Sequence, residues 1–266
     1  FSTNIKAIAP TNESKFLRGG AISLGKTTFN GTAFAGQHIG GNGYVVGGDL
    51  LYRQALFKIG VRAVSVFQVD TDGKAATCTI FSSHKTRSVI VGTDYQVILH
   101  HQLLFGECAV NSTGKIGLIQ GTLLTLSPIT QIGILFRHYD PSFNSPIGNA
   151  FAASSPIQGE TGCYLTGHGI ISKCCEMDVY YDYYRNTCLT YRTDIPSSGM
   201  DLGASIQYIL NRDTKLIIKY LYKNKEQNSS NGIYYRTIDE FNRHKLRTVI
   251  TFLPFKYIKL TTELDG

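Results

Sequence analysis

The chain has 266 residues, with 26 Lys and Arg against 19 Asp and Glu, so its formal net charge is +7. Apolar residues make up 42% of it, which is too many for a disordered chain, and no run approaches the roughly 18 consecutive apolar residues of a transmembrane helix. Charged residues are only 17%, against roughly 25% in an ordinary soluble domain. The composition leaves a β-rich globular domain or a membrane β-barrel.

Residues 20–27 match the phosphate-binding pattern G-x-x-x-x-G-K-[ST]. That pattern binds a nucleotide only where a helix follows the loop, because backbone N–H groups at the helix start face the phosphates. The residues after Thr27 are β-branched and interrupted by glycine, which disfavours a helix. Nucleotide binding is therefore disfavoured, and we predict no cofactor.

The next segment, residues 49–59, is the best helix candidate, because Leu50, Leu51 and Ala55 could line one side of a helix. The same residues also alternate at period two, and we favour a strand. Residues 57–63 continue the alternation. Further strands are predicted over 102–110, 115–126 and 129–139, separated by turns at 111–114 and 127–128.

The last third of the sequence shows the clearest strand pattern. Residues 201–211 place Leu202, Ile206 and Tyr208 on one side, and Arg212 and Asp213 form a turn into a strand over 215–223. A polar loop is predicted over 224–234, then strands over 245–252 and 257–264, with Pro254 at the turn. Short segments of this kind predict an all-β fold, an antiparallel transmembrane outer-membrane β-barrel of about 14 strands, in a single domain over residues 1–266.

The two sides of these strands differ in character. The polar side carries isolated charges among Gly, Ser, Gln and Tyr, and we predict a charge network in a barrel lumen, formed by Glu107, Arg137, Asp178 and Asp182. The apolar side ends repeatedly in Tyr or Phe, which suits a membrane–water boundary. A soluble β-sandwich that binds a carbohydrate or a protein remains the alternative.

Six cysteines are present, four of them within residues 163–188, but their spacing does not match a zinc site. A disulfide of Cys188 with Cys163, Cys174 or Cys175 stays open. The seven histidines show no arrangement with a nucleophilic Ser or Cys. We therefore predict no catalytic residue and no metal site.

Basic residues gather around one late loop, at Lys223, Lys225, Arg236, Arg243, Lys245 and Arg247. Two interpretations stay open. They are solvated loop and lumen charges, or they form a basic mouth that attracts an anionic polymer.

Short motifs between about residue 84 and residue 263 follow an order found in one family. They are His84-Lys85-Thr86, Asp94-Tyr95, Phe105-Gly106-Glu107, Phe136-Arg137-His138-Tyr139-Asp140, Ala150-Phe151, Gly159-Glu160-Thr161-Gly162-Cys163-Tyr164, Tyr181-Asp182 and Pro196-Ser197-Ser198-Gly199-Met200. The chain thereby resembles the C-terminal barrel region of Bacteroidota outer-membrane proteins that carry helix-hairpin-helix (ComEA-like) repeats. It departs from them in having Gly159 where the family usually has Asn, and in having no Trp.

The resemblance implies an outer-membrane location, as a whole mature chain or as the C-terminal part of a longer one. Implied partners are outer-membrane lipid and other envelope proteins in a complex, with nucleic acid contacted only through a module absent from this sequence. The resemblance supplies no catalytic activity. We predict a non-enzymatic outer-membrane protein that is structural or channel-like, or a subunit of an envelope or DNA-uptake complex.

Overall fold

The structure is a computed structural model that describes residues 17–38, 43–68, 87–143, 145, 150–153, 157–189, 193–211, 213–229, 238–255 and 258–265. These residues form fourteen β-strands, and consecutive strands are hydrogen-bonded neighbours in one sheet with the order β1 to β14. The pairing is antiparallel. The prediction of an all-β antiparallel sheet of about 14 strands is confirmed.

No helix among the described residues is long and apolar enough to cross a membrane. Contacts between Cα atoms group the chain into two compact units. Unit 1 comprises Phe1–Gly121 and Arg137–Thr161, and unit 2 comprises Thr122–Phe136 and Gly162–Gly266. The prediction of a single domain stays a prediction.

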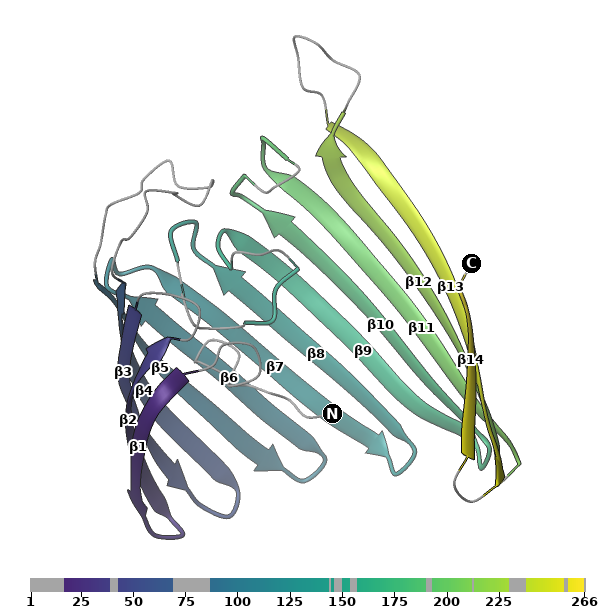
Figure 1. The fold of residues 1–266 in the computed structure, drawn as a ribbon, viewed down its shortest axis with the longest axis horizontal. Coiled ribbons are helices and arrows are strands. Elements are labelled where there is room, and N and C mark those ends of the chain that lie inside the picture. Colours follow the sequence, from purple (N-terminus) through teal and green to yellow (C-terminus); the bar gives the residue numbers. More distant parts are fainter. Residues whose placement is uncertain are drawn as a thin grey trace. The chain divides into compact units, whose positions relative to one another are not determined.

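Unit 1 contains six strands in chain order, which lie side by side in purple to teal in Figure 1. They are β1 (Leu17–Gly25), β2 (Phe29–His38), β3 (Gly43–Arg53), β4 (Phe57–Gln68), β5 (Arg87–Leu99) and β6 (Gln102–Asn111). Two further strands begin or end in this unit, β7 (Ile116–Ser127) and β8 (Thr130–Tyr139). Strands were predicted over most of β6, β7 and β8, and these predictions are confirmed.

Two alternatives from the first third of the sequence are decided by these strands. The helix considered over 49–59 does not form, because β3 ends at Arg53 and the Gln54 N–H donates to the Phe57 carbonyl at 2.8 Å in a turn to β4. The phosphate-binding pattern at 20–27 lies on β1 and its turn, and the Lys26 N–H donates to the Phe29 carbonyl. A second strand, β2, follows where nucleotide binding requires a helix.

Unit 2 contains most of β9 (Glu160–Ser172), then β10 (Cys175–Asn186), β11 (Ser197–Asn211), β12 (Thr214–Asn228), β13 (Ile238–Phe255) and β14 (Ile258–Asp265). The predicted hairpin around 212–213 is confirmed. The predicted loop over 224–234 begins too early, because β12 continues to Asn228 and its polar tip pairs with β13 as far as Ile238. The apolar/polar alternation cannot reveal a strand segment that is polar on both sides.

Pro254 lies inside β13, where the pairing with β14 shifts register between Phe252 and Phe255. Proline has no N–H to donate to the ladder, so an irregular position near a strand end is where a sheet tolerates it. The predicted turn is therefore displaced by a few residues from Pro254.

In unit 1 many apolar side chains are on the exposed face of the strands, although Val45, Val64 and Val66 form a buried apolar cluster on the other side. On β4, Ile59 and Val61 are exposed while Gly60 is buried and Arg62 is half-buried. On β5, Tyr95 is exposed and its neighbour Asp94 is buried. A soluble domain places these residue types the other way round. We call the side of Arg62, Asp94 and Glu107 the charged face of unit 1 and the side of Ile59, Val61 and Tyr95 its apolar face.

Unit 2 has the same inversion. On β10, Val179 and Tyr183 are exposed, whereas Asp182 and Tyr184 are buried. The register carries these faces across to β11 and β12, because Asp182 lies opposite Asp201 and Asp201 opposite Lys223. We call the side of Asp182, Asp201 and Lys223 the charged face of unit 2. Its apolar face carries exposed Leu202, Ile206, Tyr208, Leu210, Ile218, Tyr220, Leu246, Ile250 and Phe252.

Tyrosine rings on the charged face of unit 2 lie over glycines of the neighbouring strand. Tyr180 is opposite Gly203 and Tyr184 is opposite Gly199. A Cβ atom on Gly203 would lie 2.1 Å from the Tyr180 ring, so only glycine leaves room for that ring to lie flat on the sheet. Such pairs account for part of the high glycine content.

Candidate functional site

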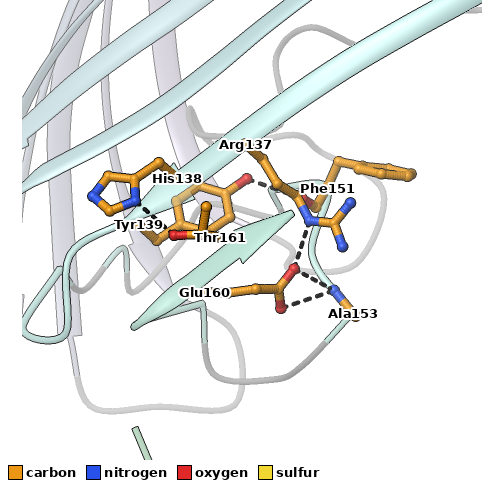
Figure 2. Close-up of polar contacts among 7 residues, drawn as sticks. All are labelled: Arg137, His138, Tyr139, Phe151, Ala153, Glu160 and Thr161. Carbon is orange, nitrogen blue, oxygen red and sulfur yellow. Dashed lines mark hydrogen bonds and ion pairs between the residues drawn. The ribbon is translucent and has the colours of Figure 1, made fainter. Parts of the chain in front are cut away.

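The most enclosed polar group in unit 1 is an ion pair between β8 and the first residue of β9. The Arg137 Nε donates to the Glu160 Oε1 at 2.5 Å, and both side chains are 0% exposed. Figure 2 shows the guanidinium and the carboxylate pointing toward each other. Two opposite charges removed from water in this way are stable only when their remaining hydrogen-bonding capacity is also satisfied.

The segment that joins β8 to β9 supplies further contacts to both charged groups. The Ala153 N–H donates to both Glu160 oxygens at 3.0 Å. The Phe151 ring lies over the guanidinium of Arg137, with 5.1 Å from the Arg137 Cζ to the ring centroid. The Tyr139 hydroxyl donates to the Phe151 carbonyl at 2.9 Å (Figure 2). The ion pair therefore fixes residues 151–153 against the end of β8.

The same segment is anchored a second time, near its start. Asp140 accepts at its Oδ2 from the Ile116 N–H at 2.9 Å, and its own N–H donates to the Ile116 carbonyl. Phe143 is fully buried, stacks on Tyr139 with 6.2 Å between ring centroids, and fills the space left by Gly117 on β7. We call Arg137, Tyr139, Phe143, Phe151, Ala153 and Glu160 the clasp.

Of the four residues predicted to form a lumen charge network, two lie in unit 1. Arg137 is in the clasp. Glu107 is 3% exposed on β6, opposite Asp94, and it acts electrostatically on Tyr139 together with Arg137 and Glu160. Asp94 in turn is bound by Arg62 at 3.1 Å. Glu107 and Arg137 therefore belong to one buried neighbourhood of acidic and basic groups.

The other two predicted residues lie in unit 2, four positions apart on β10. Asp178 is exposed, and its Oδ1 lies 2.7 Å from the His168 Nδ1. Asp182 is buried opposite Asp201, which binds the Lys223 ammonium at 2.7 Å. The two aspartates therefore have different surroundings, and the four-residue network as a whole stays a prediction.

Glu160 and Asp201 were not predicted as site residues, and Lys223 stood out only as one of the basic residues around the late loop. Glu160 was present only as part of a motif, next to Gly159. Gly159 has φ 62°, a left-handed conformation that glycine adopts freely and asparagine tolerates better than most residues.

Among the described residues, the remaining chemical questions are metal binding, disulfides and histidine contacts. No group of three His, Cys, Asp or Glu among them is placed to hold a metal ion. The five described cysteines, Cys108, Cys163, Cys174, Cys175 and Cys188, form no disulfide with one another, so the pairings of Cys188 left open above are not present. Cys78 lies outside the described residues. His138 contacts Thr161 at 2.8 Å between Nδ1 and Oγ1, pointing away from the ion pair (Figure 2).

Comparison with known proteins adds no assignment. No protein-family model matches the chain, and no curated protein matches it. The function is therefore inferred from the exposure of the two strand faces and from the clasp.

Proposed function

We propose that the chain is a non-enzymatic outer-membrane β-barrel protein, structural or channel-like in role. The single observation that carries this proposal is the inverted exposure of the two faces. Exposed Ile59, Val61 and Tyr95 alternate with buried or half-buried residues that include Arg62 and Asp94 in unit 1, and exposed Tyr183 lies between buried Asp182 and Tyr184 in unit 2. Water does not favour such a surface, whereas the hydrocarbon of a bilayer does.

The apolar face also has a suitable length. On β11 it runs from Met200 to Leu210, and these ten residue steps (210 − 200) correspond to about 33 Å along the strand. With a strand tilt of about 40°, the band is about 25 Å tall, the height of the lipid-facing band of outer-membrane barrels. A strand edge cannot be left unpaired in lipid, so the proposal includes closure of the sheet through its end strands.

The apolar face of β12 and β13 ends in aromatic residues with polar tips. The Tyr220 hydroxyl lies 2.9 Å from the His244 Nδ1, and the Tyr222 hydroxyl donates to the Asn242 Oδ1 at 2.9 Å. Beyond them the same face carries polar residues, such as Asn224, which binds Glu240. A change from aliphatic to aromatic to polar side chains along one face is expected at a membrane–water boundary.

The soluble β-sandwich predicts two stacked sheets with the Leu, Ile and Tyr residues packed between them. The fourteen strands belong to one sheet order, and Leu202, Ile206 and Tyr208 are exposed. These two observations favour the barrel. A role in an envelope or DNA-uptake complex rests on the family resemblance alone, and cross-linking in cells followed by identification of the linked proteins tests it.

The proposal is tested by fractionation and by gel mobility. We expect the chain, produced in a Gram-negative host, to remain in the outer-membrane fraction after washing with alkaline carbonate and to require detergent for extraction. We also expect an unheated sample to migrate differently from a boiled one, because a closed barrel resists detergent. Recovery of a folded protein in the soluble fraction would overturn the proposal. Conductance steps in planar bilayers separate the channel-like role from the purely structural one.

A further inference from the structure

The charged face of unit 2 carries an excess of basic side chains on two adjacent strands. They occupy alternate positions, as strand geometry requires for residues on one face. We call them the basic row: Lys215, Lys219, Lys223 and Lys225 on β12, and Arg243, Lys245 and Arg247 on β13. On β11 to β13 the same face carries two acids, Asp201 and Asp239, so that the charge there is 7 − 2 = +5, while the neighbouring β10 adds Glu176, Asp178 and Asp182 to that face.

The register places like charges directly opposite each other. Lys219 lies opposite Arg247, and Lys223 lies opposite Arg243, on strands that lie side by side in Figure 1. Cations at directly opposed positions of an antiparallel pair repel each other and destabilise the sheet.

The acids on this face satisfy only part of the row. Asp201 binds Lys223, and β14 brings Asp265 opposite Arg247 in the backbone register. Lys215, Lys219 and Arg243 make no hydrogen bond or ion pair with any residue in the part of the chain that the structure describes. Lys219 and Arg243 are exposed and Lys215 is half-buried, so a solute on this side of the sheet has access to them.

The charged face of unit 1 is organised differently. There Arg62 binds Asp94 and Arg137 binds Glu160, so that each of these cations already has an acidic partner. On the same face Arg53 lies opposite Lys58 beside the turn between β3 and β4, so opposed cations also occur in unit 1. What distinguishes unit 2 is that its cations continue along two adjacent strands, where Lys215, Lys219 and Arg243 can bind an anion from outside the chain.

We infer that the basic row is a binding and selectivity site for small anions such as inorganic phosphate. The inference rests on the proposed barrel, in which this face lines the lumen. Rows of Lys and Arg facing a lumen favour anion entry, because they lower the electrostatic barrier for anions and raise it for cations. Ammonium and guanidinium groups on adjacent strands can donate together to one oxyanion that accepts several hydrogen bonds.

The reversal potential across planar bilayers under a potassium chloride gradient tests this inference. We expect chloride to be several-fold more permeant than potassium, and added inorganic phosphate to reduce the chloride current. The variant Lys215→Gln/Lys219→Gln/Arg243→Gln should bring the permeability ratio close to one. The control Lys26→Gln/Lys173→Gln/Arg185→Gln removes the same three charges from exposed positions outside the row and should keep the wild-type ratio.

The outcomes separate the inference from the function on which it rests. A conducting protein without anion preference, or with a preference that the first triple variant keeps, overturns the inference and leaves the channel in place. If no conductance occurs, the channel-like role fails, and thermal unfolding in detergent with inorganic phosphate decides the binding claim. Phosphate should then stabilise the wild type and the control variant more than the first triple variant. Equal stabilisation of all three overturns the inference.

Discussion

Arg137 and Glu160 form an ion pair at 2.5 Å although neither side chain retains any exposed surface. Their burial depends on the segment between β8 and β9, since Phe151 covers the guanidinium and Ala153 binds the carboxylate. A fold that places a charge pair under its own connecting segment uses the pair to hold that segment in place. The clasp therefore links the end of β8, the start of β9 and residues 151–153 into one structure.

Replacing Arg137 by Leu should destabilise the folded protein by about 3–5 kcal/mol, because Glu160 would be left buried without its partner. Thermal unfolding in detergent, followed by the loss of the fast-migrating form on unheated gels, measures the effect. The double variant Arg137→Leu/Glu160→Leu removes both charges and should recover much of the loss. A single variant as stable as the wild type, or a double variant worse than the sum of the single ones, would contradict this account.

Replacing Gly117 by Ala should lower stability by about 1–3 kcal/mol through overpacking. The new Cβ would lie 2.7 Å from the Cζ of Phe143, which is fully buried and has little room to move. Gly20→Ala is the matched control, since nothing lies within 4 Å of a Cβ at that position. The measurement is the melting temperature of each variant. Equal values for Gly117→Ala and Gly20→Ala would show that Phe143 is not held against β7.

Lys223→Gln should destabilise unit 2 by less than about 1 kcal/mol, because the loss of its partly exposed ion pair with Asp201 is offset in part by relief of the repulsion from Arg243 opposite it. The substitution removes the cation that binds Asp201, and Asp201 lies opposite Asp182. Lys215→Gln is the matched control, because Lys215 is also a lysine of β12 but forms no ion pair with a described residue. Urea unfolding midpoints should fall for the first variant and not for the second; a reversed order would refute the pairing argument.

Labelling of Cys174 tests the orientation that the proposed barrel requires. Cys174 is exposed in the short turn between β9 and β10, and short turns of outer-membrane barrels face the periplasm. In a variant that keeps Cys174 as its only cysteine, a membrane-impermeant maleimide should leave intact cells unlabelled and label them once the outer membrane is opened. Ser112→Cys in the same background, in the turn between β6 and β7, should be labelled on intact cells. The opposite pattern would invert the topology.

The strands that were predicted by residue range could be found because each has one apolar side over most of its length. Period-two alternation located β11 and the hairpin at 212–213, and it favoured strand over helix at residues 49–59. It failed at the tips of β12 and β13, where the strands carry polar residues on the face that is apolar elsewhere. There the strands are held by backbone pairing and by side-chain hydrogen bonds such as that from Asn224 to Glu240. A prediction based on apolar alternation ends a strand where the apolar face ends.

The clasp could be predicted only in part. Arg137 and Glu107 stood out as isolated charges on a polar side, which is a local property of the sequence. The partner of Arg137 did not, because Glu160 is 23 residues away and reaches it only through the turn at Gly159 and the fold of the connecting segment. Charge pairs between distant strands depend on register, which composition and periodicity leave undetermined.

The membrane-facing direction of the apolar face is the central claim, and a single tryptophan tests it most directly. The chain contains no Trp, so Ile206→Trp and Ser205→Trp each introduce one fluorophore at adjacent positions on opposite faces of β11. In vesicles of lipid brominated along the acyl chain, we predict strong quenching of the Ile206→Trp variant and weak quenching of the Ser205→Trp variant, with iodide in the water giving the reverse order. Equal quenching of both by brominated lipid, or quenching of the Ser205→Trp variant alone, would contradict the assignment.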